Sequence, residues 1–155
     1  MKIIVNIFAC IFLFCPFIPA FSQNLVWVET ELFENKGGWT HESQFIDQMG
    51  SSYLLAHGLG QPVDNAETTV RFKEPGKYHF WVRTKDWVPT DTHAGPGEFQ
   101  VLINDIPVGG VFGSDKIKQW HWAYGGEVLI NDEEIKLSLQ DMTGFERRCD
   151  VICFS

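Results

Sequence analysis

Hydrophobic and polar residues alternate along much of the chain after residue 23, which is the pattern of half-buried β-strands. Gly, Pro, Asn and Asp separate the alternating runs and supply the backbone angles that turns require. The pattern predicts strands over residues 25–31, 53–56, 67–72, 78–84, 99–103, 127–130, 134–139 and 149–154. Seven to nine short strands with regular turn signals favour an all-β fold, a single β-sandwich domain.

Three local features refine this outline. Glu74-Pro75-Gly76-Lys77 predicts a type II turn, which would join residues 67–72 and 78–84 as a hairpin. Residues 44–49 could form a short helix or an irregular loop. Trp81 lies inside an alternating strand, and we expect it in the core.

Residues 1–23 predict a secretory signal peptide. A basic start at Lys2 precedes a nearly continuous apolar run, which ends at a small-residue boundary before Gln23. Pro16, Pro19 and the early change to polar sequence argue against a membrane anchor, because a span needs about 20 apolar residues. We therefore expect a secreted or periplasmic protein with no membrane contact after cleavage.

The composition excludes some partners. Removing 23 of 155 residues leaves 132, enough for one domain with a sizeable core. The whole chain has a formal net charge of −8, and only Lys2 is lost, so 11 basic and 20 acidic residues leave −9. This charge repels nucleic acid and anionic lipid. It suits a neutral or cationic ligand, or metal ions held by carboxylates.

Two cysteines remain after the signal segment, at Cys149 and Cys153. In a regular strand they share one face about 13 Å apart. A disulfide needs Cα atoms within about 7 Å, so we expect no bond between them. They are interpreted as two small buried hydrophobes.

Glu29 and Glu31 share one face of the first predicted strand. Two carboxylates on one face could hold a structural calcium ion, which prefers oxygen ligands. The alternative is that they are ordinary edge-strand charges that oppose aggregation. The two residues alone leave both readings open.

Tryptophan is abundant, and all six Trp residues follow the signal segment. Trp120 and Trp122 flank His121, so an extended segment places both indoles on one side. Trp87 opens a loop rich in Pro and Gly, and such loops often carry recognition. Indoles can stack on the apolar C–H faces of sugars, while polar neighbours bind hydroxyls. The predicted ligand site comprises Trp87, Trp120, Trp122 and Tyr124 with Asp86, Arg83 and His121; alternatively, most of these indoles fill the core.

Several segments resemble calcium-containing jelly-roll carbohydrate-binding modules. Residues 28–31 (Val-Glu-Thr-Glu) resemble their opening strand, residues 74–83 resemble their Gly-x-Tyr hairpin, and residues 149–154 resemble their closing strand. The resemblance implies a galactose-binding-like jelly roll. It also implies that Asp150 joins Glu29 and Glu31 at the calcium site.

A second resemblance is to the module of secreted bacterial FAD-dependent oxidoreductases. Its marks are residues 37–39, 44–51, 53–60, 82–88, 120–122 and 143–150. Gly58-Leu59-Gly60 lacks the third glycine and the following helix of a dinucleotide site, so we expect no FAD in this chain.

The sequence therefore predicts a binding module without an enzymatic reaction of its own, since no H-E-x-x-H or G-x-S-x-G motif occurs. One interpretation is a carbohydrate-binding module that belongs with a larger exported enzyme. The alternative is a structural module, with no ligand of its own, that packs on a neighbouring catalytic domain or on a second copy.

Overall fold

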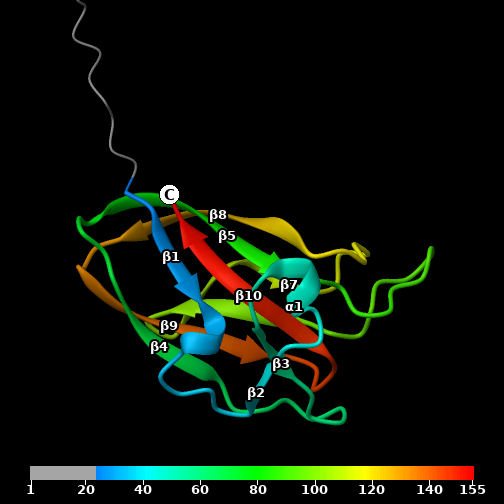
Figure 1. Ribbon diagram of the computed structural model, residues 1–155. Coiled ribbons are helices and arrows are strands. Elements are labelled where there is room, and N and C mark those ends of the chain that lie inside the picture. The colour runs from blue at the N-terminus through cyan, green and yellow to red at the C-terminus, as the bar shows by residue number, and fades with distance from the viewer. Residues whose placement is uncertain (1–23) are drawn as a thin grey trace, which may run out of the picture.

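Two antiparallel β-sheets face each other in the computed structural model, which describes residues 24–155 (Figure 1). The predicted signal peptide lies outside the described residues. Residues 24–155 contain no helix of the length and apolar character that crossing a membrane requires. The first and last strands lie side by side, because β1 pairs with β10 (Figure 1).

The larger sheet has six strands in the order β2-β3-β10-β5-β8, with β1 also paired to β10. The smaller sheet has the order β4-β9-β6-β7. A 3₁₀ turn and a single helical turn complete the described elements. The bounds are β1 Val26–Glu29, η1 Thr30–Leu32, β2 Trp39–Glu42, α1 Ile46–Met49, β3 Tyr53–Ala56, β4 Ala66–Arg71, β5 Gly76–Thr84, β6 Phe99–Ile103, β7 Ile106–Phe112, β8 His121–Ile130, β9 Glu134–Asp141 and β10 Arg147–Phe154.

The core fills the space between the sheets with the inward-facing half of each alternating strand. Aromatic rings meet across this space: Phe80 of β5 lies 6.3 Å from Phe112 of β7, and Trp39 of β2 lies 5.9 Å from Phe99 of β6, between ring centroids. Strand β10 is buried along its whole length because it lies between other strands of the larger sheet. The predicted all-β jelly-roll sandwich is confirmed.

The predicted hairpin around Pro75 is wrong. Strand β4 pairs with β9 in the smaller sheet, whereas β5 pairs with β8 and β10 in the larger one. The turn therefore carries the chain from one sheet to the other. Gly76 is not among the glycines with positive φ, so the turn is also not of type II. The Tyr78 hydroxyl donates to the Glu74 carbonyl at 2.7 Å and fixes this crossing.

Strand β10 contains a β-bulge at Asp150. Cys149 lies opposite Thr84, and Val151 lies opposite the adjacent Arg83, so Asp150 is an extra residue on β10. A bulge of this kind changes the direction of the side chains around it. Asp150 consequently faces Arg83, on the outer side of the sheet, and not the core.

The bulge also separates the two cysteines. Cys149 belongs to the core, while Cys153 lies opposite Trp81 on the other face of the sheet. Both thiols are free and buried, in agreement with the predicted absence of a disulfide. The prediction that they share a face is wrong, because it assumed a regular strand.

Trp81 is not in the core as predicted, because 37% of its surface is exposed. In β5 the buried positions are Tyr78, Phe80 and Val82, and Trp81 alternates with them. It therefore points away from the sandwich interior, as the polar His79 does.

Candidate functional site

Four aromatic side chains cover part of the outer face of the six-stranded sheet: Trp27, Trp81, Trp122 and Tyr124. We call this surface the aromatic face. Their exposed fractions are 49% for Trp27, 37% for Trp81, 41% for Trp122 and 51% for Tyr124. A cross-strand row explains the grouping, since Cys153 lies opposite both Trp27 and Trp81, and Trp81 lies opposite Tyr124. Opposite residues of neighbouring strands share a face.

The rings of the aromatic face contact one another in pairs. The centroids of Trp27 and Trp122 lie 5.4 Å apart with an edge-to-face angle of 64°. The centroids of Trp81 and Tyr124 lie 4.6 Å apart. His79 Nδ1 lies 2.7 Å from the Tyr124 hydroxyl. The face thus offers both apolar ring surface and polar edge groups to a ligand.

A second aromatic group, the loop cluster, lies near α1 and consists of Phe45, Tyr53, Trp87, Trp120 and Arg148. The Phe45 centroid is 6.1 Å from both Trp87 and Trp120, and Trp120 is 5.0 Å from the buried Tyr53. The Arg148 guanidinium lies 3.9 Å from the Trp87 centroid and is itself buried. This internal cation–π contact covers part of Trp87. Trp87 and Trp120 are each only partly exposed.

The predicted ligand residues therefore divide between two places. Trp122 and Tyr124 belong to the aromatic face, whereas Trp87 and Trp120 belong to the loop cluster. His121 is partly buried, and its Nε2 lies 2.5 Å from the Asp115 carboxylate.

Asp86 does not have the accessible position that its predicted role requires. It is fully buried and accepts hydrogen bonds from the backbone N–H groups of Gly95 and Lys116, at 3.0 and 2.9 Å. Its carboxylate therefore joins two loops and is not free to bind a sugar hydroxyl. Arg83 is partly exposed and forms an ion pair with Asp150, with 3.1 Å between Nη1 and Oδ2.

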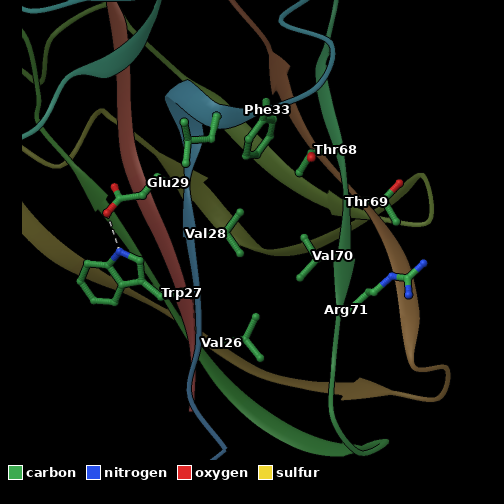
Figure 2. A pocket seen from close by; sticks show the side chains of 10 residues that line it. Val26, Trp27, Val28, Glu29, Phe33, Thr68, Thr69, Val70 and Arg71 are labelled. Carbon is green, nitrogen blue, oxygen red and sulfur yellow. Dashed lines mark hydrogen bonds between the residues drawn. The ribbon is translucent and has the colours of Figure 1, made fainter.

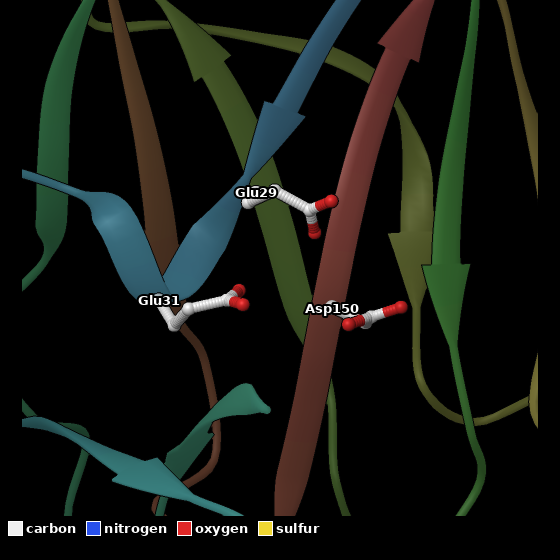
Figure 3. A group of neighbouring side chains, drawn as sticks. All are labelled: Glu29, Glu31 and Asp150. Carbon is white, nitrogen blue, oxygen red and sulfur yellow. The ribbon is translucent and has the colours of Figure 1, made fainter. Parts of the chain in front are cut away.

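Three carboxylates converge beside the aromatic face: Glu29 at the end of β1, Glu31 in η1 and Asp150 at the bulge of β10 (Figure 3). We call them the carboxylate cluster. One oxygen atom from each lies within 4.8 Å of the others. The Thr30 hydroxyl donates to the Cys149 carbonyl at 2.6 Å and holds η1 against β10.

Each carboxylate has one oxygen that accepts a hydrogen bond. Glu29 Oε1 accepts from Trp27 Nε1 at 2.7 Å, Glu31 Oε1 from the Ser52 hydroxyl at 3.4 Å, and Asp150 Oδ1 from the Ser51 hydroxyl at 3.0 Å. The Oε2 atoms of Glu29 and Glu31 are buried and accept none. Buried anionic oxygens without partners are costly, so this arrangement fits a hard cation.

The titration behaviour agrees with a crowded anionic site. Burial raises the pKa of Glu31, and the charges of Glu29 and Asp150 raise it further, while hydrogen bonds from its own backbone and from Ser52 oppose the increase. Burial also raises the pKa of Asp150, with a further contribution from Glu29, while Ser51 and Arg83 oppose the increase. Loss of solvation and mutual repulsion both disfavour the ionised forms, and a divalent cation would remove both penalties.

A groove of about 270 Å³ lies on the opposite side of β1, between β1 and β4 (Figure 2). Val26, Val28 and Phe33 face Val70 across it, while Trp27 and Glu29 point to the other side of β1 (Figure 2). Trp27 and Glu29 nevertheless border the groove, so it adjoins the aromatic face and the carboxylate cluster across β1.

No family model and no curated protein sequence matches the chain. Solved structures do match it. The GH26-CBM35 β-(1,4)-mannanase of Podospora anserina aligns with a TM-score of 0.66 and 15% identity, over 86% of this chain and 28% of the mannanase. The C-terminal CBM6 of the laminarinase LamC from Zobellia galactanivorans aligns with a TM-score of 0.63 and 14% sequence identity, over 85% of this chain and 99% of that module. A carbohydrate-binding module CBM36 in complex with calcium and xylotriose aligns with a TM-score of 0.60 and 16% sequence identity, over 84% of this chain and 99% of that module.

The chain has the jelly-roll fold of carbohydrate-binding modules. Two of these structures are matched over nearly their whole length, whereas the chain spans only about a quarter of the mannanase.

Sequence analysis did not assign Trp27 and Trp81 to the ligand surface, although a signal was present. Trp27 is two residues from Glu29 in β1, and Trp81 is two residues from both His79 and Arg83 in β5, so each indole lies on the same side of its strand as these polar residues. An indole that alternates with apolar positions and shares its face with polar residues is expected to be outside. This shared face with polar residues could have outweighed the general tendency of Trp to be buried.

Proposed function

We propose that this chain is a non-catalytic carbohydrate-binding module that is exported and acts with a larger enzyme. The observation that carries the proposal is the aromatic face, where three indoles and one phenol are exposed together on a rigid sheet. The jelly-roll fold supports it, since carbohydrate-binding modules share that fold.

The chemistry of the aromatic face suits a sugar ring. An apolar C–H face of a sugar can stack on an indole, while the Tyr124 hydroxyl, His79 and Arg83 lie close enough to the rings to bind sugar hydroxyls. Arg83 lies opposite Trp122 in the sheet. The formal net charge of −8 disfavours a strongly anionic polymer. The proposed ligand is therefore a neutral or weakly charged glycan.

The carboxylate cluster completes the proposal as a structural calcium site. Glu29, Glu31 and Asp150 would hold the ion and thereby join the first strand to the last. Calcium supplies positive charge to oxygens that the fold leaves buried and unpaired.

Native gels that contain soluble xylan, β-1,4-mannan or laminarin test the glycan proposal. We expect retention of the wild-type protein in at least one gel, and at least about tenfold weaker binding for Trp81→Ala and Trp122→Ala, a loss of about 1.4 kcal/mol. Ile106→Ala is the matched control, because Ile106 is exposed on the edge strand β7 of the other sheet. Equal retention of all four proteins would show that the aromatic face is not the binding surface.

The alternative function is a structural module that packs on a catalytic domain, for which the sequence resemblance suggests a flavin-dependent oxidoreductase, or on a second copy. The groove beside β1 favours it, because the exposed Leu32 borders the groove next to Val28 and Val70. Sedimentation velocity at rising concentration tests self-association. A dimer that Leu32→Glu dissociates, together with no glycan retention, would favour this alternative.

A further inference from the structure

We infer that the carboxylate cluster and the aromatic face are coupled, so that a divalent cation bound by Glu29, Glu31 and Asp150 holds Trp27 in its ligand-binding position. Glycan binding then depends on the cation, because the cation fixes the orientation of Trp27, which is part of the binding surface. The inference rests on the proposed function of the aromatic face.

Glu29 is the residue that joins the two sites. Its Oε1 accepts the indole N–H of Trp27 at 2.7 Å (Figure 2), and its Oε2 is one of the buried oxygens of the cluster that accept no hydrogen bond. The ring of Trp27 lies 5.4 Å from the ring of Trp122, between centroids. One carboxylate therefore contacts the aromatic face with one oxygen and the cluster with the other.

The charge balance of the cluster decides how firmly Glu29 is held. Three carboxylates face one guanidinium, that of Arg83, so acidic groups outnumber basic groups by three to one. The remaining polar groups are the neutral hydroxyls of Ser51 and Ser52. Without a cation, repulsion favours rotation of the partly exposed Glu29 away from the buried Asp150. Trp27 would then lose its acceptor.

A divalent cation reverses this tendency. A cation held by the three carboxylates would offset their mutual repulsion, and Glu29 could keep its hydrogen bond from Trp27 on Oε1 because Oε2 is a second oxygen without a hydrogen bond. The backbone of Glu29 is fixed by pairing with Val151 in β10, so the change is confined to side chains. Holding Trp27 in its bound orientation before the glycan arrives reduces the ordering cost of binding.

Two measurements on the full chain test the coupling. Calcium chloride is titrated while intrinsic tryptophan fluorescence is recorded, and glycan retention is compared in gels with calcium and with EGTA. We expect a fluorescence change in wild type that Trp27→Phe loses and Trp81→Phe keeps. We also expect glycan binding to be about fivefold or more weaker in EGTA for wild type, which is the usual scale of coupling between sites. Trp27→Phe, which lacks the indole N–H, should bind equally in both gels.

The outcomes separate the inference from the proposed function. Equal glycan retention with calcium and EGTA, combined with a calcium-dependent rise in melting temperature, would overturn the coupling and leave the glycan site intact. Absence of any calcium response in fluorescence would also overturn it. Absence of glycan retention in every gel would overturn the proposed function, while a fluorescence change confined to Trp27 would still support the link between the cation and that side chain.

Discussion

Replacing Glu31 with Gln tests whether the three carboxylates form a cation site. The substitution keeps the size of the side chain and removes one negative charge from the cluster. Glu31 contributes one of the three buried carboxylate oxygens of the cluster that accept no hydrogen bond, and it lies in η1, outside the pairing of β1 with β10. The fold should therefore tolerate the change.

Glu31→Gln should have opposite effects with and without calcium. In EGTA at neutral pH the charge of Glu31 is unfavourable, because its pKa is raised by burial and then by Glu29 and Asp150. A carboxyl with a raised pKa stabilises the fold below its ordinary pKa, here 4.5, and this stability is lost as pH rises through the raised pKa. We therefore expect Glu31→Gln to melt above wild type in EGTA, with a smaller loss of stability between acid and neutral pH.

In calcium the order should reverse. At a free calcium concentration 100 times the Kd, binding to the native state adds about 2.7 kcal/mol to the free energy of unfolding. For a domain of this size that corresponds to a rise in melting temperature of roughly 10 °C. Glu31→Gln should lose most of this rise, because it removes an anionic ligand.

Differential scanning calorimetry at several pH values, in EGTA and in calcium chloride, measures both effects. Glu34→Gln is the matched control, because Glu34 is exposed and lies just beyond η1. The reasoning is refuted if wild type and Glu31→Gln show the same calcium-induced rise, or if no rise occurs in wild type over a wide calcium range.

Two further substitutions test the interpretation of the scaffold. Asp86→Ala leaves two backbone N–H groups without their acceptor, so urea unfolding should show a loss of about 1–3 kcal/mol per group, whereas Asp91→Ala in the same loop should change stability little. An unchanged urea midpoint for Asp86→Ala would contradict this structural role and leave Asp86 a candidate for ligand binding. Gly125→Ala places a methyl group 2.2 Å from the Phe80 ring and should cost about 1–3 kcal/mol, while Gly110→Ala meets no atom within 4 Å and should cost less. Equal melting of these two variants would contradict the close approach at Gly125.

The alternation of the chain determined the fold class, because a period of two residues fits a strand with one buried face. The positions of the strands were largely predicted, although β8 begins six residues earlier than expected. The face of β5 was not predicted, because Phe80 and Val82 are in the core in place of the expected Trp81. Strands β2 and β7 escaped prediction because their mostly exposed residues give no clear alternation. The turn at Pro75 and the strands on either side of it were predicted, but the strands that pair with each of them were not.

Strand pairing over long sequence distances decided the rest. The sequence predicted Glu29 and Glu31 on one face of a strand, and the resemblance to calcium-containing modules added Asp150. In the structure β1 ends at Glu29, and Glu31 lies in η1. Only the pairing of β1 with β10 and the bulge in β10 bring the three carboxylates together. A bulge depends on the register of two neighbouring strands, which the pattern of one strand does not contain.

The binding surface shows the same division. The spacing around His121 predicted that Trp120 and Trp122 share one side, but the structure separates them, because Trp120 precedes β8 and contacts Phe45 and Tyr53. Trp27 and Trp81 alternate with apolar positions, but the tendency of indoles to be buried outweighed that signal. Which aromatic residues meet was decided by the order β1-β10-β5-β8, which places Trp27 beside Trp122 and leaves Trp87 in the loop cluster. Local pattern determines which face a side chain occupies, whereas its neighbours on that face depend on strand order, because residues far apart in the chain become adjacent only when the sheet forms.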